Sequence, residues 1–472
     1  MSKHSNQEYV RKPLSGGVIV KGAILLIIGV ILVVIGFGGG SAYVGPIEDI
    51  EKFELQKVEY IAKKKEVLSN KLMMNKSEEE THGVKEKPAG SEHKKDDHSK
   101  DSHATDGHGS HSSEPTINTR LWANFLVMFL FVLSIGAGSL FLVGLDYLVG
   151  ANWSTPLKRI TEILCFMIFP AFILGLVIYL GGMDSIYSSW VNMDKSDKIL
   201  KGKAAYLNKE WFLIRFVLVY IFWGIFYFFF INNSKKQDDS KDQKYTALSG
   251  KFAPIFMIGF SFAITIVAID WIMTLSPKWF STMFGVAYFG GAVTAALAAI
   301  VYATVKMKEN GYLHPKMKND TFYSLAGLLF GFNCFWAYVS FCQFMLIWYS
   351  NIPEETFWYI YRWDGAWLWY TLCMIVFHFV IPFFALISRS SKTNLARLKV
   401  MAVWLLVAHY VDLYWQVTPT FSNSPFIGAI EIGFLLISLG LLVVVFAVRA
   451  KNVNHVAIGD PRLEQGLGFR LH

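Results

Sequence analysis

The stretch 407-VAHYVDLYWQVTPTF-421 lies inside an apolar run that is long enough to cross a membrane, yet it carries side chains that lipid excludes. His409 and Asp412 are three residues apart, and Gln416 follows Asp412 by four. Residues at these spacings share one face of a helix. A carboxylate at membrane depth costs on the order of 3 kcal/mol, so such a residue is retained for a partner or a task.

A second stretch, 268-AIDWIMTLSPKWF-280, repeats this pattern. Asp270 precedes Ser276-Pro277 as Asp412 precedes Thr418-Pro419, without a gap and 142 residues apart. Each run closes an apolar segment. Seven helical residues rise about 10 Å, so we expect both aspartates about two turns below the same membrane surface.

Composition places the chain among membrane proteins. Of its 472 residues, 53% are hydrophobic and 17% are charged, well below the roughly one quarter typical of soluble domains. The net charge of +8 follows the loops and forms no nucleic-acid footprint. The four cysteines all fall in apolar runs and make no CxxC or Cys/His zinc spacing.

The apolar runs predict an all-α polytopic membrane protein with ten transmembrane helices. We expect the spans at about 22–44, 121–149, 157–182, 211–232, 252–275, 281–306, 322–349, 366–389, 398–418 and 426–449. Lys and Arg number 23 in the short loops and tails of one side and 7 on the other. This bias predicts both termini in the cytoplasm. The loop 183–210, which has five lysines on the outer side, runs against the bias.

The topology divides the chain into five regions. They are 1–45 (N-tail and first span), 46–119 (an outer, periplasmic insertion), 120–276 and 277–419 (two four-helix bundles) and 420–472 (tenth span and cytoplasmic C-tail). The insertion has six histidines and, over 76–115, almost no apolar side chains, so we expect partial disorder, with a transition-metal site as the alternative.

The repeated aspartate run predicts that the second to fifth spans and the sixth to ninth spans form two repeated bundles. Spans one and ten would flank them. Internal repeats are common in membrane proteins that move substrates or ions. We hypothesise that Asp270, His409 and Asp412 transfer protons. The further residues assigned to a proton path or to the vicinity of a substrate are Asp146, Glu162, His378 and Gln416.

Other functions remain open at this point. His378 and His409 fall at similar depth on consecutive spans, as ligands of a b-type haem do, but a hydrogen-bonding or proton-relay role is the commoner one. An ion-coupled transporter would also suit buried carboxylates and repeats. Structural hydrogen bonds are the simplest reading of Asp146, Glu162 and Glu431. No P-loop, GxGxxG, GxSxG or HExxH motif with its required context is present.

Three motifs resemble those of a known family: 270-DWIMTLSPKWFSTMFG-285, 409-HYVDLYW-415 and 460-DPRLEQGLGF-469. They are similar to the ActF-type membrane subunit of alternative complex III, within the NrfD/PsrC-like family. The resemblance covers residues 120–470 and implies a subunit of a quinol:cytochrome c oxidoreductase in the bacterial cytoplasmic (inner) membrane.

The resemblance also implies which proteins and lipids associate with this chain. The expected partners are a homologous ten-helix membrane subunit, extrinsic iron–sulfur and multihaem cytochrome c subunits, lipid, quinol and a terminal oxidase. The chain itself would hold no redox cofactor, while a quinone such as menaquinone would be the lipid-phase reactant. Because two such membrane subunits occur together, the alternative is a structural scaffold subunit without an open quinone site.

Overall fold

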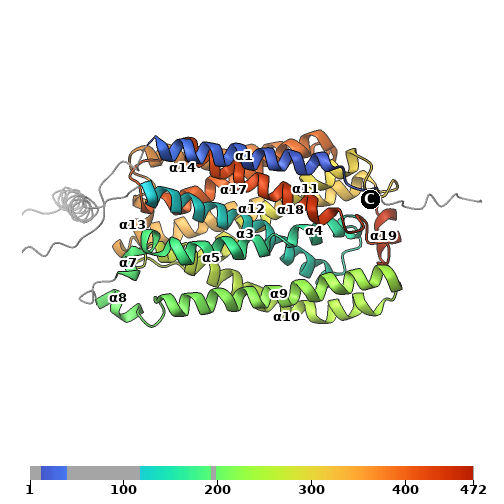
Figure 1. Ribbon diagram of the computed structural model, residues 1–472, viewed down its shortest axis with the longest axis horizontal. Helices are drawn as coiled ribbons and strands as arrows, with labels where there is room; N and C mark the ends of the chain where they lie inside the picture. The colour runs from blue at the N-terminus through green and yellow to red at the C-terminus, as the bar shows by residue number, and fades with distance from the viewer. Residues whose placement is uncertain (1–11, 40–116, 193–197, 471–472) are drawn as a thin grey trace, which may run out of the picture. The chain divides into compact units, whose positions relative to one another are not determined.

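The computed structural model describes residues 12–39, 117–192 and 198–470. Within these ranges the chain is all-helical, without a strand, and ten helical spans are long and apolar enough to cross a membrane (Figure 1). The protein is therefore a multi-pass membrane protein, as predicted. The insertion 46–119, with its six histidines, lies outside the described residues except for its last three.

The spans follow the predicted order with small shifts at their ends. Their helices are α1 (Gly16–Gly38), α3 (Ile117–Val149), η1 (Thr155–Leu157) with α4 (Lys158–Cys165) and α5 (Ile168–Gly181), α9 (Lys209–Ser240), α10 (Lys244–Trp271), α11 (Phe284–Glu309), α12 (Asn319–Ser350), α14 (Gly365–Ile375) with η3 (Val376–Val380) and α15 (Ile381–Leu386), α17 (Leu395–Val417) and α18 (Ala429–Ala450). The first span begins six residues earlier than predicted, at Gly16.

Shorter helices lie between the spans. They are α6 (Met183–Ile186), α7 (Ser188–Val191), α8 (Lys198–Lys203), η2 (Met273–Leu275), α13 (Pro353–Ile360), α16 (Arg389–Thr393), η4 (Thr418–Thr420) and α19 (Leu463–Gly468).

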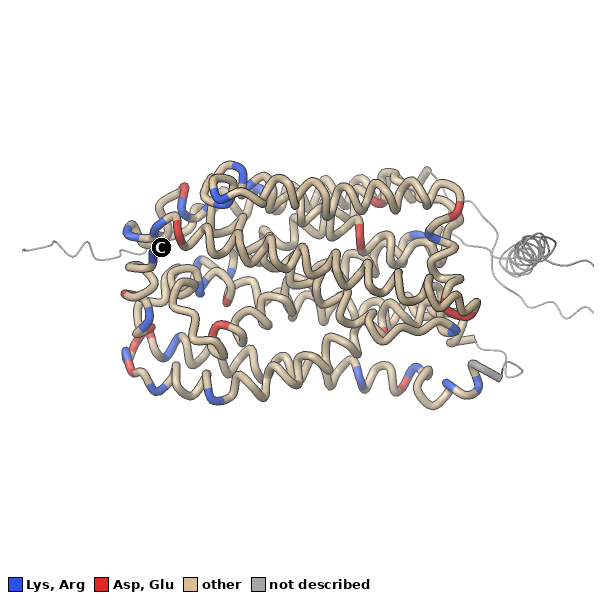
Figure 2. Tube along the Cα trace, turned by 180° about the vertical axis from the view of Figure 1, so that it is seen from behind, with Lys and Arg blue, Asp and Glu red and all other residues tan. Residues whose placement is uncertain are grey.

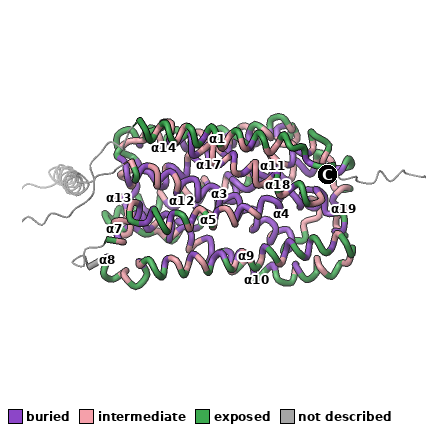
Figure 3. The backbone as a smooth tube through the Cα atoms, viewed as in Figure 1, coloured by how far each residue is buried: buried purple, intermediate pink, exposed green. Residues whose placement is uncertain are grey.

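Helix α3 occupies the centre of the helical body, and its apolar window is entirely buried (Figure 3). Its sequence is apolar all round, as expected of a helix with no lipid-facing side. Helix α11 packs along α3, and Gly138 lets the two backbones approach. A Cβ on Gly138 would lie 2.7 Å from the carbonyl oxygen of Ala292.

Helices α1 and α18 form an antiparallel pair on the outside of the body. Gly22, Gly29 and Gly36 of α1 recur every seven residues; Gly22 lies beside Gly440 of α18, Gly29 beside Gly433 and Gly36 beside Ile430. A Cβ on Gly29 would lie 2.7 Å from the carbonyl oxygen of Gly433. Small residues at such a contact allow the close backbone packing that holds helices together in lipid.

Two prolines interrupt spans. Pro170 lacks the amide hydrogen that would bond Phe166, and the helix breaks between α4 and α5 at 166–167. Pro382 lacks the one that would bond His378, and the five residues before α15 form a π-helical segment, η3, centred on His378. A proline inside a span predicts a kink, whereas the wider turn around His378 has no signal in the sequence.

Charged residues gather at the two ends of the helical body (Figure 2). We call the end that holds residues 451–470 the tail end, and the opposite one the far end. At the tail end Asp460 accepts from Lys158 at 2.7 Å, and Arg462 donates to Asp146 at 2.9 Å. The C-terminal segment is thereby fastened to α3 and α4.

Candidate functional site

Asp412 lies on α17 towards its far end and is 2% exposed. Its Oδ2 accepts hydrogen bonds from Trp336 Nε1 of α12 at 3.2 Å and from Gln416 Nε2 at 3.0 Å. The predicted contact between Asp412 and Gln416 on one helix face is therefore present. No Lys or Arg of the described residues forms an ion pair with Asp412, so its charge is balanced only by two neutral donors.

His409 is one turn below Asp412 and is fully buried, but it does not hydrogen-bond Asp412. Its Nε2 lies 3.0 Å from Ser134 Oγ on the central helix α3. Ser134 Oγ also donates to the carbonyl of Leu130 at 2.7 Å. The other ring nitrogen of His409, Nδ1, has no hydrogen-bond partner in the described structure.

His378 stands at the centre of the π-helical segment η3 and is fully buried. Neither of its ring nitrogens has a hydrogen-bond partner among the described residues. Its ring packs on Trp336 with 3.8 Å between centroids, and lies 6.5 Å from the ring of His409. Trp336 thus contacts both Asp412 and His378. π-Helical turns are frequent at functional sites.

We call Asp412, Gln416, Trp336, His378, His409 and Ser134 the Asp412 cluster. Gly291 of α11 gives it room: a Cβ there would lie 3.0 Å from Cε1 and 3.1 Å from Nδ1 of His409. Tyr288, one turn earlier on α11, has its hydroxyl 3.3 Å from Ser134 Oγ. Hydrogen bonds therefore continue from His409 into the interface between α3 and α11.

Asp270, the repeat counterpart of Asp412, has a different environment. It is 2% exposed and lies on the last turn of α10, which ends at Trp271. Arg215 Nε of α9 donates to Oδ2 at 2.8 Å, and the Tyr206 hydroxyl donates to Oδ1 at 2.7 Å. Burial, together with the neighbouring Asp270 carboxylate, raises the pKa of Tyr206 above its ordinary value, so the phenol keeps the proton that it donates.

The other predicted carboxylates are also paired with cations. Asp146 accepts from Arg462 and from Ser154, and Glu162 accepts from Arg159. Glu431 accepts from Arg120 at 2.6 Å. Asp146 and Glu162 lie near the tail end, well separated along α3 and α4 from the far-end position of Asp270. These ion pairs agree with a structural role for Asp146, Glu162 and Glu431, which is the simplest interpretation of their sequence positions.

Several contributors escaped the sequence reading. Ser134, Tyr288 and Gly291 sit in apolar helices where a single small or aromatic residue gives no signal. Arg215 was visible as an arginine within a predicted span, which is a rare placement that calls for a partner. Trp336 could not be singled out among the many aromatic residues of the spans, because tertiary packing decides which group its indole nitrogen bonds.

The arrangement can bind and release a proton. Asp412 is an acceptor without a compensating cation, and the imidazoles of His378 and His409 together offer three ring nitrogens without a partner in the described residues. The described residues contain no cluster of three His, Cys, Asp or Glu placed to hold a metal ion.

Comparison with known proteins adds no assignment: no protein-family model matches the sequence, and no curated protein matches it.

Proposed function

We propose that the chain is a membrane subunit of a quinol:cytochrome c oxidoreductase of the alternative complex III type, and that the Asp412 cluster transfers protons in it. The observation that supports the proton role is a buried carboxylate with two neutral donors and, within the part of the chain that the structure describes, no cation; two buried histidines with nitrogens unpartnered in the same ranges lie beside it. The motifs of the sequence carry the assignment to this class of enzyme.

The proposal includes an internal repeat. The first four-helix bundle would consist of α3, α4–α5, α9 and α10, and the second of α11, α12, α14–α15 and α17. Two features support it. Helices α10 and α17 are each followed by a 3₁₀ turn, η2 and η4, and the first helices of the two bundles, α3 and α11, pack against each other.

The proposed place of the chain is the bacterial inner membrane with the tail end in the cytoplasm, which the excess of Lys and Arg in the loops of that end supports. A homologous ten-helix subunit would lie beside it. Iron–sulfur and multihaem cytochrome c subunits would cover the far end and carry the electrons. Quinol would be the reductant, and a terminal oxidase would be a further partner.

In this proposal a proton released at the far end binds Asp412 and converts the carboxylate to the neutral acid. It then passes to an unprotonated imidazole nitrogen of His378 or His409, and the carboxylate is restored. The two rings are 6.5 Å apart between centroids, too far for a direct hydrogen bond, so exchange between them needs a bridging water or a ring rotation. Ser134 and Tyr288 extend the route from His409 into the interface of α3 and α11.

A scaffold function is the second candidate. Four of the carboxylates noted in the sequence, Asp146, Glu162, Asp270 and Glu431, are bound to arginine. Such pairs fix helices relative to each other and need no proton chemistry. The scaffold proposal therefore explains these four residues, but it gives no reason for a buried Asp412 without a cation.

The test of the enzyme class is purification of the tagged full chain from its own membrane in mild detergent. We expect haem c and iron–sulfur clusters to co-purify, together with quinol-dependent reduction of cytochrome c. A chain that purifies alone and catalyses ion exchange in liposomes would contradict the proposal and favour a transporter. An assembled, active complex that tolerates Asp412→Asn without change in proton transfer would favour the scaffold.

A further inference from the structure

The chain passes from α15 to α17 at the tail end through the short helix α16, and this turn is strongly basic. It carries Arg389, Lys392 and Arg397, which we call the turn cations. No acidic residue occurs in the sequence between Asp364 and Asp412. The turn therefore cannot balance its own charge, and a counter-charge has to come from another element or from a ligand.

Two aromatic rings of α12 hold two of these cations in place. The Lys392 ammonium lies 4.4 Å from the ring centroid of Phe330. Arg389 and Lys392 each lie 5.8 Å from the ring centroid of Tyr323. Such contacts orient a positive charge but do not neutralise it. Asp320, three residues before Tyr323, forms no ion pair with either cation in the described structure. Both cations are thus held in position without a carboxylate partner there.

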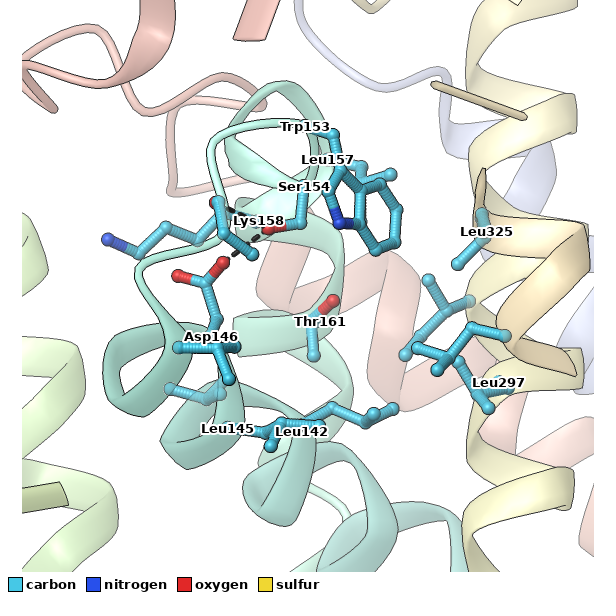
Figure 4. Close-up of a pocket in the computed structure, with 15 residues that line it drawn as sticks. Leu142, Leu145, Asp146, Trp153, Ser154, Leu157, Lys158, Thr161, Leu297 and Leu325 are labelled. Atoms are coloured by element: carbon cyan, nitrogen blue, oxygen red, sulfur yellow. Dashed lines mark hydrogen bonds between the residues drawn. The ribbon is translucent and has the colours of Figure 1, made fainter. Parts of the chain in front are cut away.

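Other cations of the tail end do have carboxylate partners. Lys399, at the start of α17, donates to Glu309 at 2.6 Å. Lys158 lines the cavity drawn in Figure 4, turns its ammonium away from Leu297 and donates to Asp460 at 2.7 Å. The fold thus supplies a carboxylate to each of these two lysines and, within the described ranges, none to the turn cations.

Exposed apolar side chains border the turn on both sides. Before it, Phe384 and Ile387 are 71% and 51% exposed, and after it Val400 is 61% exposed. Arg397 donates to the hydroxyl of Ser391 and precedes Val400 by three residues, so it shares a helix face with Val400. Positive charge therefore lies at the end of an apolar surface of the spans, where the head groups of a membrane begin.

We propose that the turn cations bind the phosphate of an acidic phospholipid, whose acyl chains lie along Phe384, Ile387 and Val400. Arginine suits phosphate because its guanidinium can donate two parallel hydrogen bonds, and lysine adds a point charge. A zwitterionic head group would bring a further positive charge to three cations that repel one another, so an acidic lipid is favoured. Free phosphate would match the cations but would leave the apolar border uncovered. The site does not depend on proton transfer by Asp412, which lies towards the far end.

The experiment is native mass spectrometry of the full chain in detergent, titrated with dioleoyl-phosphatidylglycerol, dioleoyl-phosphatidylcholine or inorganic phosphate. The test variant replaces the three turn cations: Arg389→Gln, Lys392→Gln and Arg397→Gln. The matched control removes three exposed lysines of the same end, in and after α9: Lys236→Gln, Lys241→Gln and Lys251→Gln. Circular dichroism verifies the folding of both variants, and the comparison of the two lipids on the wild type needs no variant.

We expect the wild type to bind phosphatidylglycerol at least about tenfold more tightly than phosphatidylcholine, because each Lys or Arg beside an anionic head group contributes about a factor of five. The test variant should lose this preference, whereas the control variant should keep it. The proposal is overturned if the two lipids bind alike to the wild type, or if the test variant keeps the preference. It is also overturned if an equal concentration of inorganic phosphate displaces half of the bound phosphatidylglycerol, which would identify a free anion as the ligand.

Discussion

Asp270 and Asp412 occupy matching places in the sequence but have different partners in the structure. Both are 2% exposed near the far ends of their helices. Asp270 has Arg215 at 2.8 Å and Tyr206 at 2.7 Å, whereas among the described residues Asp412 has only the side chains of Trp336 and Gln416. One aspartate is half of an ion pair, and the other is a buried acid among neutral donors.

The difference shows how one sequence pattern serves two purposes. An ion-paired carboxylate tends to stay charged because its protonation would leave the buried cation without a counter-charge. A carboxylate among neutral donors can change its protonation state without leaving a charge uncompensated. If the two runs descend from one duplicated element, the first has kept or gained a cation on α9, and the second has two histidines instead.

The largest effect is expected from removing the cation. Arg215→Leu leaves Asp270 buried without its partner, and loss of one member of a buried pair costs about 3 kcal/mol or more. Thermal unfolding followed by circular dichroism measures the loss. The double change Arg215→Leu with Asp270→Leu should recover most of it, because no charge is then buried.

Lys209→Leu is the matched control for Arg215→Leu. Lys209 lies on the same helix and pairs with Asp184, but both side chains are largely exposed, at 44% and 70%. An exposed pair contributes about 0–1 kcal/mol, so this variant should unfold like the wild type. Equal losses in both variants would show that the pair of Asp270 is not the buried structural link described above.

The next largest effect is expected at Gly291, on the Asp412 side of the comparison. Gly291→Ala places a methyl group about 3.0 Å from His409, and overpacking of this kind costs about 1–3 kcal/mol. It should also slow proton transfer by displacing the His409 ring. Gly327→Ala on α12 is the control, since its Cβ meets nothing within 4 Å. Normal stability and turnover in Gly291→Ala would contradict a role for His409 in proton transfer.

The ten spans could be predicted from the sequence because each needs about twenty apolar residues, and this requirement is written into local composition. The shared face of Asp412 and Gln416 followed from helical spacing. The bond of His409 to Ser134 did not, because it depends on which helix packs beside α17. The ion pair of Asp270 likewise depends on α9, which lies 55 residues earlier at Arg215.

The smallest effect is expected at Asp460, in the C-terminal segment 451–470. Burial opposes the charge of Asp460, but Lys158 and Arg462 outweigh it and hold the pKa of this carboxyl below its ordinary range. Because the folded pKa is depressed, the stabilisation is complete above the ordinary pKa of about 3.9 and is lost only as the pH falls through the lower folded value. Like Asp270, this carboxylate is part of a buried ion pair.

We therefore expect amide hydrogen exchange of residues 451–470 to show the same protection from pH 8 down to about pH 4, after correction for the intrinsic rates. Asp460→Asn should reduce the protection equally at every pH in this window. Release of the segment between pH 7 and pH 5 in the wild type would be incompatible with a carboxylate held by Lys158 and Arg462.

The central claim is that Asp412, and not a paired carboxylate, carries protons. The most direct test is proton translocation by the assembled complex in proteoliposomes, driven by quinol, with Asp412→Asn compared with Glu309→Gln at an exposed pair of the tail end. Asparagine can still accept from Trp336 and Gln416, so the fold should survive. We predict at least a tenfold loss of translocation in Asp412→Asn and none in Glu309→Gln. Unchanged translocation in a folded Asp412→Asn complex would contradict the account.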